Sequence, residues 1–193
     1  MADTKTSAET AATTPTGAEL VRIVQGGSSK KTTLAVAGHQ FRGARVRMTT
    51  DDTTQNVTAG AAISFDSAEF DTDSFWAAGT PTRLTIPAGL GITHVEATGQ
   101  ANVSAGTADT WRSLSIQHWN SVDAAQHTVG QRQVEGGATG GALSVSTGPL
   151  EVADGDYFVL LLQEESDNSI TIEGDSGSVH TFLALKVLGM EPV

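Results

Sequence analysis

Residues 63–76 read ISFDSAEFDTDSFW, and residues 81–97 continue PTRLTIPAGLGITHVEA. The first stretch mixes large apolar residues with four carboxylates, which are Asp66, Glu69, Asp71 and Asp73. Such a mixture suits a calcium loop, a pair of catalytic acids, or a corner of an all-β domain. The choice among these three decides between an enzyme and a structural protein.

The calcium interpretation can be tested against the spacing of an EF-hand loop. That loop needs oxygen ligands at alternate positions, a glycine at the sixth position and a glutamate at the twelfth. Counted from Asp71, the sixth residue is Trp76 and the twelfth is Thr82. The EF-hand is therefore ruled out, while a looser calcium site on Asp71 and Asp73 stays an alternative.

The catalytic interpretation has little support from motifs. A glycosidase needs two carboxylates held across a cleft, one of them in an apolar pocket, and sequence spacing does not test that geometry. Four acids crowded between residues 66 and 73 are typical of a solvated corner. The chain has no G-x-S-x-G elbow, P-loop or dinucleotide fingerprint. We expect no enzyme activity, no catalytic residue and no cofactor.

Metal and thiol chemistry are also disfavoured by the sequence. The chain has no cysteine, which excludes disulfides and thiolate sites. No histidine forms an i, i+4 pair or an H-x-H, so metal binding has no support from spacing. We expect no metal site and place the histidines on strand or loop surfaces; they are His39, His94, His118, His127 and His180.

Short β-like segments fill the chain from about residue 40 onward. They are rich in β-branched and aromatic residues, and Gly, Asp, Asn, Ser and Thr separate them. DGD at 154–156 indicates a tight turn before the most apolar segment. The pattern predicts an all-β fold, a β-sandwich or jelly roll, with strands at 43–49, 55–65, 82–86, 90–98, 110–117, 125–134, 142–147, 157–163, 169–173 and 179–188.

The N-terminal region has a different composition. Residues 1–17 are rich in Thr, Ala and Ser and are expected to be disordered. A short strand around Val21–Val24 and a second strand beginning at Thr32 flank Gly26 and Gly27. This region is too small to fold alone. We therefore divide the chain into an extended arm, residues 1–41, and a β domain, residues 42–193.

Charge is distributed unevenly between these regions. The whole chain has a formal net charge of -11, which argues against nucleic acid as a main partner. Residues 1–60 carry seven basic and five acidic side chains, whereas residues 61–193 carry four and seventeen. This difference favours a docking surface at the front and a solvated, repulsive exterior behind it. No apolar run approaches the roughly 20 residues that cross a membrane.

Several motifs of the β domain resemble one family when taken in order. F-D-x-x-x-x-W (Phe70–Trp76) and Pro81–Ile92 resemble the first half of the complement globular-head domain, a tumour-necrosis-factor-like jelly roll. Leu150–Leu162 and His180–Val187 resemble its later strands, with Ala184 in place of a glycine. The resemblance spans about residues 42–189, although the chain lacks the family's core cysteine and much of its tyrosine.

This resemblance implies how residues 63–76 are used. The stretch becomes a corner whose carboxylates face water. Its aromatic residues are core anchors, each stabilising the fold by about 1.5–3 kcal/mol if fully buried. The predicted anchors in this stretch are Phe65, Phe70 and Phe75. Phe158 and Phe182, on later strands, are also predicted core anchors. The family also implies a homotrimer with apolar strand faces packed around a threefold axis.

The arm carries a second resemblance. Leu20–Gly38 is similar to the V-V-Q-G-G-x-T-K-K-T-T lead of bacteriophage tail-fibre and head-fibre proteins. This similarity implies an arm that docks onto other virion proteins, capsid or tail. The candidate docking residues are Leu20, Val21, Arg22, Ile23, Val24, Gln25, Lys30 and Lys31.

These resemblances together suggest a bacteriophage virion structural protein, a surface-displayed trimeric head fibre, spike or capsid decoration. It would be made in the host cytoplasm and displayed on the virion exterior. A tail fibre or host-adhesion protein of the virion is one alternative, and a secreted jelly-roll carbohydrate-binding adhesin is another. The expected partners are copies of the chain itself and other virion proteins, with a host surface glycan as a further candidate. Nucleic acid and membrane are not expected partners.

Overall fold

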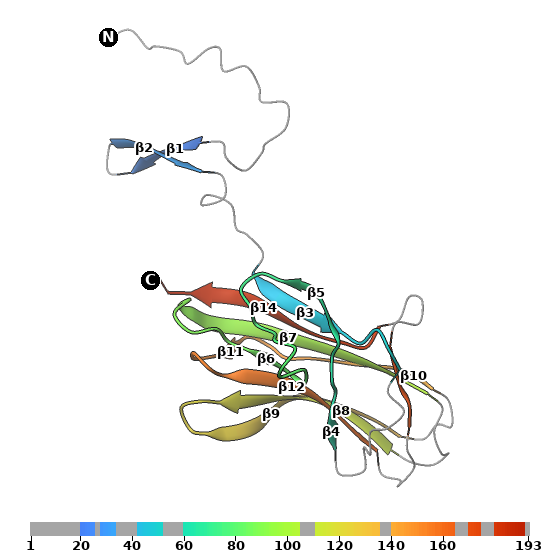
Figure 1. Ribbon diagram of the computed structural model, residues 1–193. Coiled ribbons are helices and arrows are strands. Elements are labelled where there is room, and N and C mark those ends of the chain that lie inside the picture. Colours follow the sequence, from blue (N-terminus) through green and yellow to red (C-terminus); the bar gives the residue numbers. More distant parts are fainter. Residues whose placement is uncertain are drawn as a thin grey trace. The chain divides into compact units, whose positions relative to one another are not determined.

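The computed structural model describes residues 20–25, 28–33, 42–51, 60–104, 111–135, 140–164, 170–174 and 180–191. Every regular element in these ranges is a β-strand (Figure 1). The described residues include no helix long and apolar enough to cross a membrane. The chain divides into two compact units, Met1–Phe41 and Arg42–Val193.

The N-terminal unit contains a two-stranded antiparallel hairpin. Strand β1 (Leu20–Gln25) pairs with β2 (Ser28–Thr33), from Leu20 opposite Thr33 to Gln25 opposite Ser28. The prediction that the second strand begins at Thr32 is wrong. Ser28–Thr33 lacks large apolar residues, and its strand is set by backbone pairing with β1 rather than by side-chain hydropathy. The predicted disordered tail, 1–17, lies outside the described residues.

The C-terminal unit, here called the body, contains two sheets whose described strand pairs are all antiparallel. The first sheet runs β10-β7-β14-β3-β5, and β11 and β13 also pair with β7. Its strands are β10 (Gly141–Ser146), β7 (Ile92–Val103), β14 (Phe182–Met190), β3 (Gly43–Arg47), β5 (Ser67–Asp71), β11 (Leu150–Glu151) and β13 (Ile172–Glu173).

The second sheet faces the first (Figure 1). It runs β4-β12-β8-β9, and β6 also pairs with β12. Its strands are β4 (Ala61–Ala62), β12 (Tyr157–Glu164), β8 (Trp111–Asn120), β9 (Ala125–Glu135) and β6 (Arg83–Thr85). The prediction of an all-β sandwich is confirmed. Of the predicted strand 55–65, residues 55–59 lie outside the described part.

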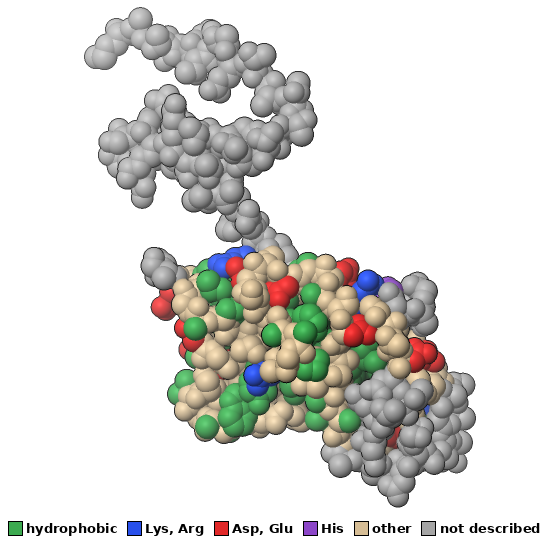
Figure 2. All heavy atoms as spheres, in the orientation of Figure 1, with side chains coloured by type: hydrophobic (Ala, Val, Ile, Leu, Met, Phe, Trp, Pro, Cys, Tyr) green, Lys and Arg blue, Asp and Glu red, His purple; other side chains and the backbone are tan. Residues whose placement is uncertain are grey.

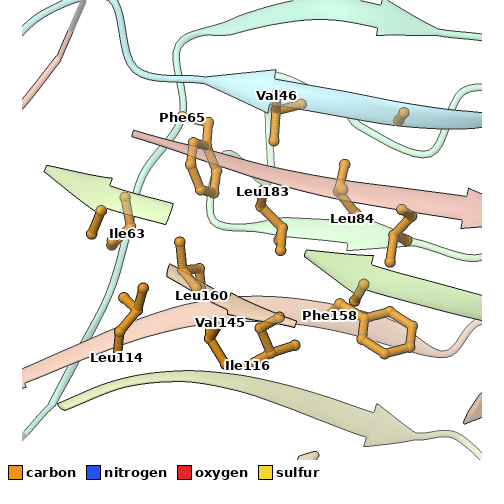
Figure 3. Packing of buried hydrophobic residues seen from close by; sticks show 14 of the residues in the cluster. Val46, Ile63, Phe65, Leu84, Leu114, Ile116, Val145, Phe158, Leu160 and Leu183 are labelled. Carbon is orange, nitrogen blue, oxygen red and sulfur yellow. The ribbon is translucent and has the colours of Figure 1, made fainter. Parts of the chain in front are cut away.

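The core lies between the two sheets and is built by alternation along the strands. Phe158 and Leu160 of β12 lie in the same buried cluster as Leu183 of β14 (Figure 3), and Leu162 also belongs to this cluster. Because successive strand residues face opposite sides, every second residue of these strands is buried. The first sheet approaches closely here, since a Cβ added at Gly99 would lie 2.5 Å from Cδ1 of Leu160.

Three of the five predicted core anchors lie in this core. Phe65, Phe75 and Phe158 are buried, and Phe158 is 0% exposed. Phe70 and Phe182 are only half-buried, so the prediction that they anchor the core is wrong. Strand β14 has apolar residues on both faces, and it is Leu183 and its alternate neighbours that face inward. Phe70 lies on the edge strand β5, opposite Arg45.

Candidate functional site

The stretch 63–76 contains an edge strand, β5, as well as the predicted corner. The corner after β5 is held by Asp71. Its Oδ1 accepts the backbone N–H of Phe75 at 2.9 Å, and its Oδ2 accepts that of Trp76 at 3.0 Å. Ser74 adopts a left-handed backbone, with φ of 67°. Because both oxygens of Asp71 are engaged by the backbone, this geometry supports a structural corner.

The neighbouring carboxylates also make protein contacts. Asp73 accepts a hydrogen bond from Nε of Arg42 at 2.9 Å, and this bond lowers the pKa of Asp73 and raises that of Arg42. Asp66 accepts hydrogen bonds from the backbone N–H of Thr49 and Thr50. The expectation that these acids simply face water is therefore wrong for Asp71 and Asp73, which are half-buried. Within the described ranges, no group of three or more potential ligands could hold a metal ion.

A buried polar network connects the end of β8 to the start of β12. Asp156 is 0% exposed and accepts a hydrogen bond at 2.8 Å from Nε2 of His118, which is 5% exposed. Asp156 also accepts the backbone N–H groups of Ser121 and Ala153. The imidazole of His118 stacks on Phe158, with ring centres 4.7 Å apart. The prediction that histidines lie on surfaces is wrong for His118.

The electrostatics of Asp156 follow from these contacts. Burial is the largest single influence and raises the pKa of Asp156. Hydrogen bonds from Ser121, Ala153 and His118 act in the opposite direction. Together they outweigh burial, so the pKa of Asp156 lies below its usual value. The carboxylate is held in its charged form inside the fold.

This network does not have the geometry of a nucleophile activated by a base. The Ser121 hydroxyl lies 2.7 Å from Asp156 Oδ1, and the imidazole of His118 donates to the other oxygen of the same carboxylate. In a catalytic triad the histidine lies between the serine and the acid. A hollow of about 300 Å³ adjoins the network, lined by Asn120, Val122, Glu151, Val152, Ala153 and Asp156. We therefore assign the network to stability: it ties the β8–β9 turn to the DGD turn.

The outer face of the first sheet is a better candidate for function. Two cross-strand rows define this association face. One is Ser144–Gln100–Phe182–Arg47–Ser67, and the other is Ser146–Thr98–Ala184–Arg45–Phe70. The inward positions of β14 are filled by Leu183 and Leu185, which leaves the alternate side chains on the outside. The two rows contain no acidic side chain, and their charged members are Arg45 and Arg47.

The association face also carries apolar side chains. The half-buried ring of Phe182 lies under the guanidinium of Arg45, at 4.1 Å from its centre. Farther along β14, Leu188 and Met190 are each 42% exposed. They are two of three exposed large hydrophobic residues in the described part of the chain, and the third is Val122. The Arg45 stack places a predicted core anchor, Phe182, in a position to contact a partner.

The predicted docking residues all lie on the β1–β2 hairpin. Leu20–Gln25 forms β1, while Lys30 and Lys31 lie on β2 opposite Ile23 and Arg22. The two strands pair only with each other among the described strands. A lone two-stranded hairpin is marginal in water, and its outer edges present backbone groups that can pair with another strand.

Comparison with known proteins identifies the fold of the body. No protein-family model matches the chain, and no curated protein matches it. Three crystal structures of murine APRIL, at pH 5.0, 8.5 and 8.0, match it with TM-scores of 0.55, 0.53 and 0.54. They are 9%, 9% and 10% identical to the chain and cover 77% of it and 100% of APRIL. This likeness establishes the fold alone, and it confirms the predicted tumour-necrosis-factor-like jelly roll.

Proposed function

We propose that the chain is a non-enzymatic structural protein of a bacteriophage virion. It forms a homotrimer that is displayed on the exterior as a head fibre, spike or capsid decoration. The observation that carries this proposal is the division into a jelly-roll body and a separate hairpin with a fibre-like Q-G-G lead, Gln25–Gly27. Such a protein needs one part that is exposed on the particle, here the body, and one part that binds the particle, here the arm.

Trimer formation uses the association face. Three jelly rolls pack around an axis and cover Phe182, Leu188 and Met190 of β14. The two rows of this face contain no acidic side chain, which supports this arrangement, because a body with a large negative charge repels its copies wherever its acids face one another. Arg45 and Arg47 add positive charge to the face and reduce that repulsion.

Attachment uses the hairpin. Its strands add to the sheet edge of a neighbouring virion protein, so that backbone hydrogen bonds supply affinity and alternate side chains supply specificity. The arm, residues 1–41, carries four basic and three acidic side chains, a net charge of +1, while residues 42–193 carry seven and nineteen, a net charge of -12. The arm therefore favours an acidic docking site on the neighbouring protein, which would attract Arg22, Lys30 and Lys31. The same site would repel the acidic body. The same arm would serve a tail fibre, and the identity of its partner decides between head and tail.

Reattachment to virions tests this function. Particles of the phage that encodes the chain are prepared without it, and purified full chain is added back. We expect the full chain to sediment with the particles and the variant Ile23→Pro to remain in solution, because proline removes a backbone donor from β1. The variant must keep the solution mass of the wild type, as proof that its body is intact. Equal sedimentation of both proteins would overturn the docking role of the arm, and sedimentation of neither would overturn the virion assignment.

A further inference from the structure

The outer face of the second sheet has an unusual composition for this chain. Four cross-strand rows make up this amide face: Thr85–Tyr157–Trp119–Gln126, Arg83–Val159–Gln117–Thr128, Leu161–Ser115–Gln131 and Gln163–Ser113–Gln133. They contain no Asp, Glu or Lys, although the chain has 22 acidic residues. On the side of the body that Figure 2 shows, most of the visible acidic side chains lie over the upper half. An anionic ligand therefore meets no acidic side chain within these four rows, and the next row, Trp111–Glu135, brings in the first one at the far end of the face.

A stack of three side chains stands at one end of the amide face. The rings of Trp119 and Tyr157 are 5.8 Å apart and nearly parallel, at 11°. Arg83 lies over the Tyr157 ring, 4.9 Å from its centre. Arg83 and Trp119 come from strands on opposite sides of β12, so they flank Tyr157. On the other side of β8 lies β9, where Gln126 is the cross-strand neighbour of Trp119.

Arg83 is the one cation of the amide face and has no ion pair with any described residue. Its Nε is buried and lacks a hydrogen-bond partner within the described residues. A buried donor without an acceptor is costly, by about 1–3 kcal/mol. Because this Nε is out of reach of a ligand from solvent, a ligand carboxylate would pair with the Nη groups of Arg83, whose planar guanidinium suits two parallel hydrogen bonds.

Glutamine side chains recur along the amide face, and Gln126 is the cross-strand neighbour of Trp119 in the stack. Nε2 of Gln126 donates a hydrogen bond to Oε1 of Gln117, and Nε2 of Gln131 donates to Oγ of Ser113 at 2.8 Å. The first bond leaves Nε2 of Gln117 as a donor and Oε1 of Gln126 as an acceptor. Amides that offer both kinds of group match the hydroxyls of a sugar, which also donate and accept. The apolar C–H face of a sugar ring can pack against an indole ring that is partly exposed, as that of Trp119 is.

We propose that the amide face binds an acidic glycan, a saccharide chain whose sugars carry carboxylates. One sugar packs against Trp119, the amides of Gln117 and Gln126 bind its hydroxyls, and Arg83 binds a sugar carboxylate. Nucleic acid fits this face poorly, because phosphate binding requires several clustered cations. The site lies on the body and on the sheet opposite the association face. It is therefore independent of both the trimer and the docking arm.

Calorimetric titration of the full chain tests the site. The probes are a hexamer of galacturonic acid and, as the neutral match, a hexamer of glucose. We expect the acidic hexamer to bind about tenfold or more tightly than the neutral one. Binding of neither hexamer at millimolar concentration would overturn the proposal, as would equal affinity for both. Neither result would affect trimer formation or docking, which use other surfaces.

Three variants locate the binding. Arg83→Gln should lose about tenfold or more in affinity for the acidic hexamer only, and Gln117→Ala should weaken binding of both hexamers. Arg132→Gln is the matched control, since it removes a cation from β9 at a position opposite Leu114 and off the amide face. All three must keep wild-type circular dichroism. Unchanged binding in Arg83→Gln, or a similar loss in Arg132→Gln, would show that general charge rather than this site attracts the glycan.

Discussion

The guanidinium of Arg45 lies 4.1 Å from the centre of the Phe182 ring, on the outside of the first sheet. Arg45 also contacts Glu69, with Nε and Oε2 3.1 Å apart. Phe182 is thus covered by a charged side chain instead of by the core. An aromatic ring in this position should contribute less to the stability of one subunit than a ring in the core does.

Phe158 and Phe182 should therefore respond differently to truncation. Phe158→Ala leaves a cavity in the core and should lower the free energy of unfolding by about 3–5 kcal/mol. Phe182→Ala should cost less than about half of that within one subunit, because its ring is half-buried. Urea unfolding at a protein concentration where both variants are monomeric makes the comparison. Equal losses would contradict the assignment of Phe182 to the outer face.

Asp71 should matter more than its acidic neighbour Glu69. Asp71→Ala leaves the backbone N–H groups of Phe75 and Trp76 without their acceptor, and should cost about 1–2 kcal/mol. Asp71→Asn keeps one acceptor oxygen and should cost less. Glu69→Ala removes an exposed ion pair and should cost under about 1 kcal/mol. Thermal unfolding ranks the three variants, and a larger loss for Glu69→Ala would contradict the corner.

Asp156 should make the stability of the body depend on pH. Its pKa is lower in the folded state than in the unfolded chain. The resulting stabilisation is full above the unfolded pKa, near about 4, and is lost as the pH falls through the folded pKa. Urea unfolding between about pH 6 and about pH 2 should show a smaller loss of stability for Asp156→Asn than for the wild type. Parallel curves for the two proteins would contradict this role, provided the variant folds at neutral pH.

The sequence predicts the fold well where one face of a strand is much more apolar than the other. On β12 the predicted anchor Phe158 lies in the core, and Leu160 and Leu162 are buried on the same face of the strand. On β14, Phe182 and Ala184 lie on one face of the strand, and Leu183 and Leu185 lie on the other. Both faces therefore carry apolar residues, and alternation alone does not identify the buried one. Only the register with β3 and β7 places Phe182 outside.

The polar contacts are harder to predict because they join distant residues. His118 and Asp156 are 38 positions apart, and no local pattern pairs them. Asp71 is different, since an aspartate followed by D-S-F-W at 73–76 is compatible with a side chain that caps its own turn. The amide face follows from the strand register, which brings Arg83, Tyr157 and Trp119 together from three strands.

The mass of the protein in solution tests the central claim, that the body assembles into a trimer through the association face. Light scattering is applied to the full chain, to the fragment 42–193 and to the full-length variant Ala184→Arg, which adds bulk and charge at the centre of that face. We predict about three times the 19.9 kDa chain mass for the full chain, a trimer for the fragment and a monomer for the folded variant. A monomeric fragment, or a trimeric Ala184→Arg variant, would contradict the claim.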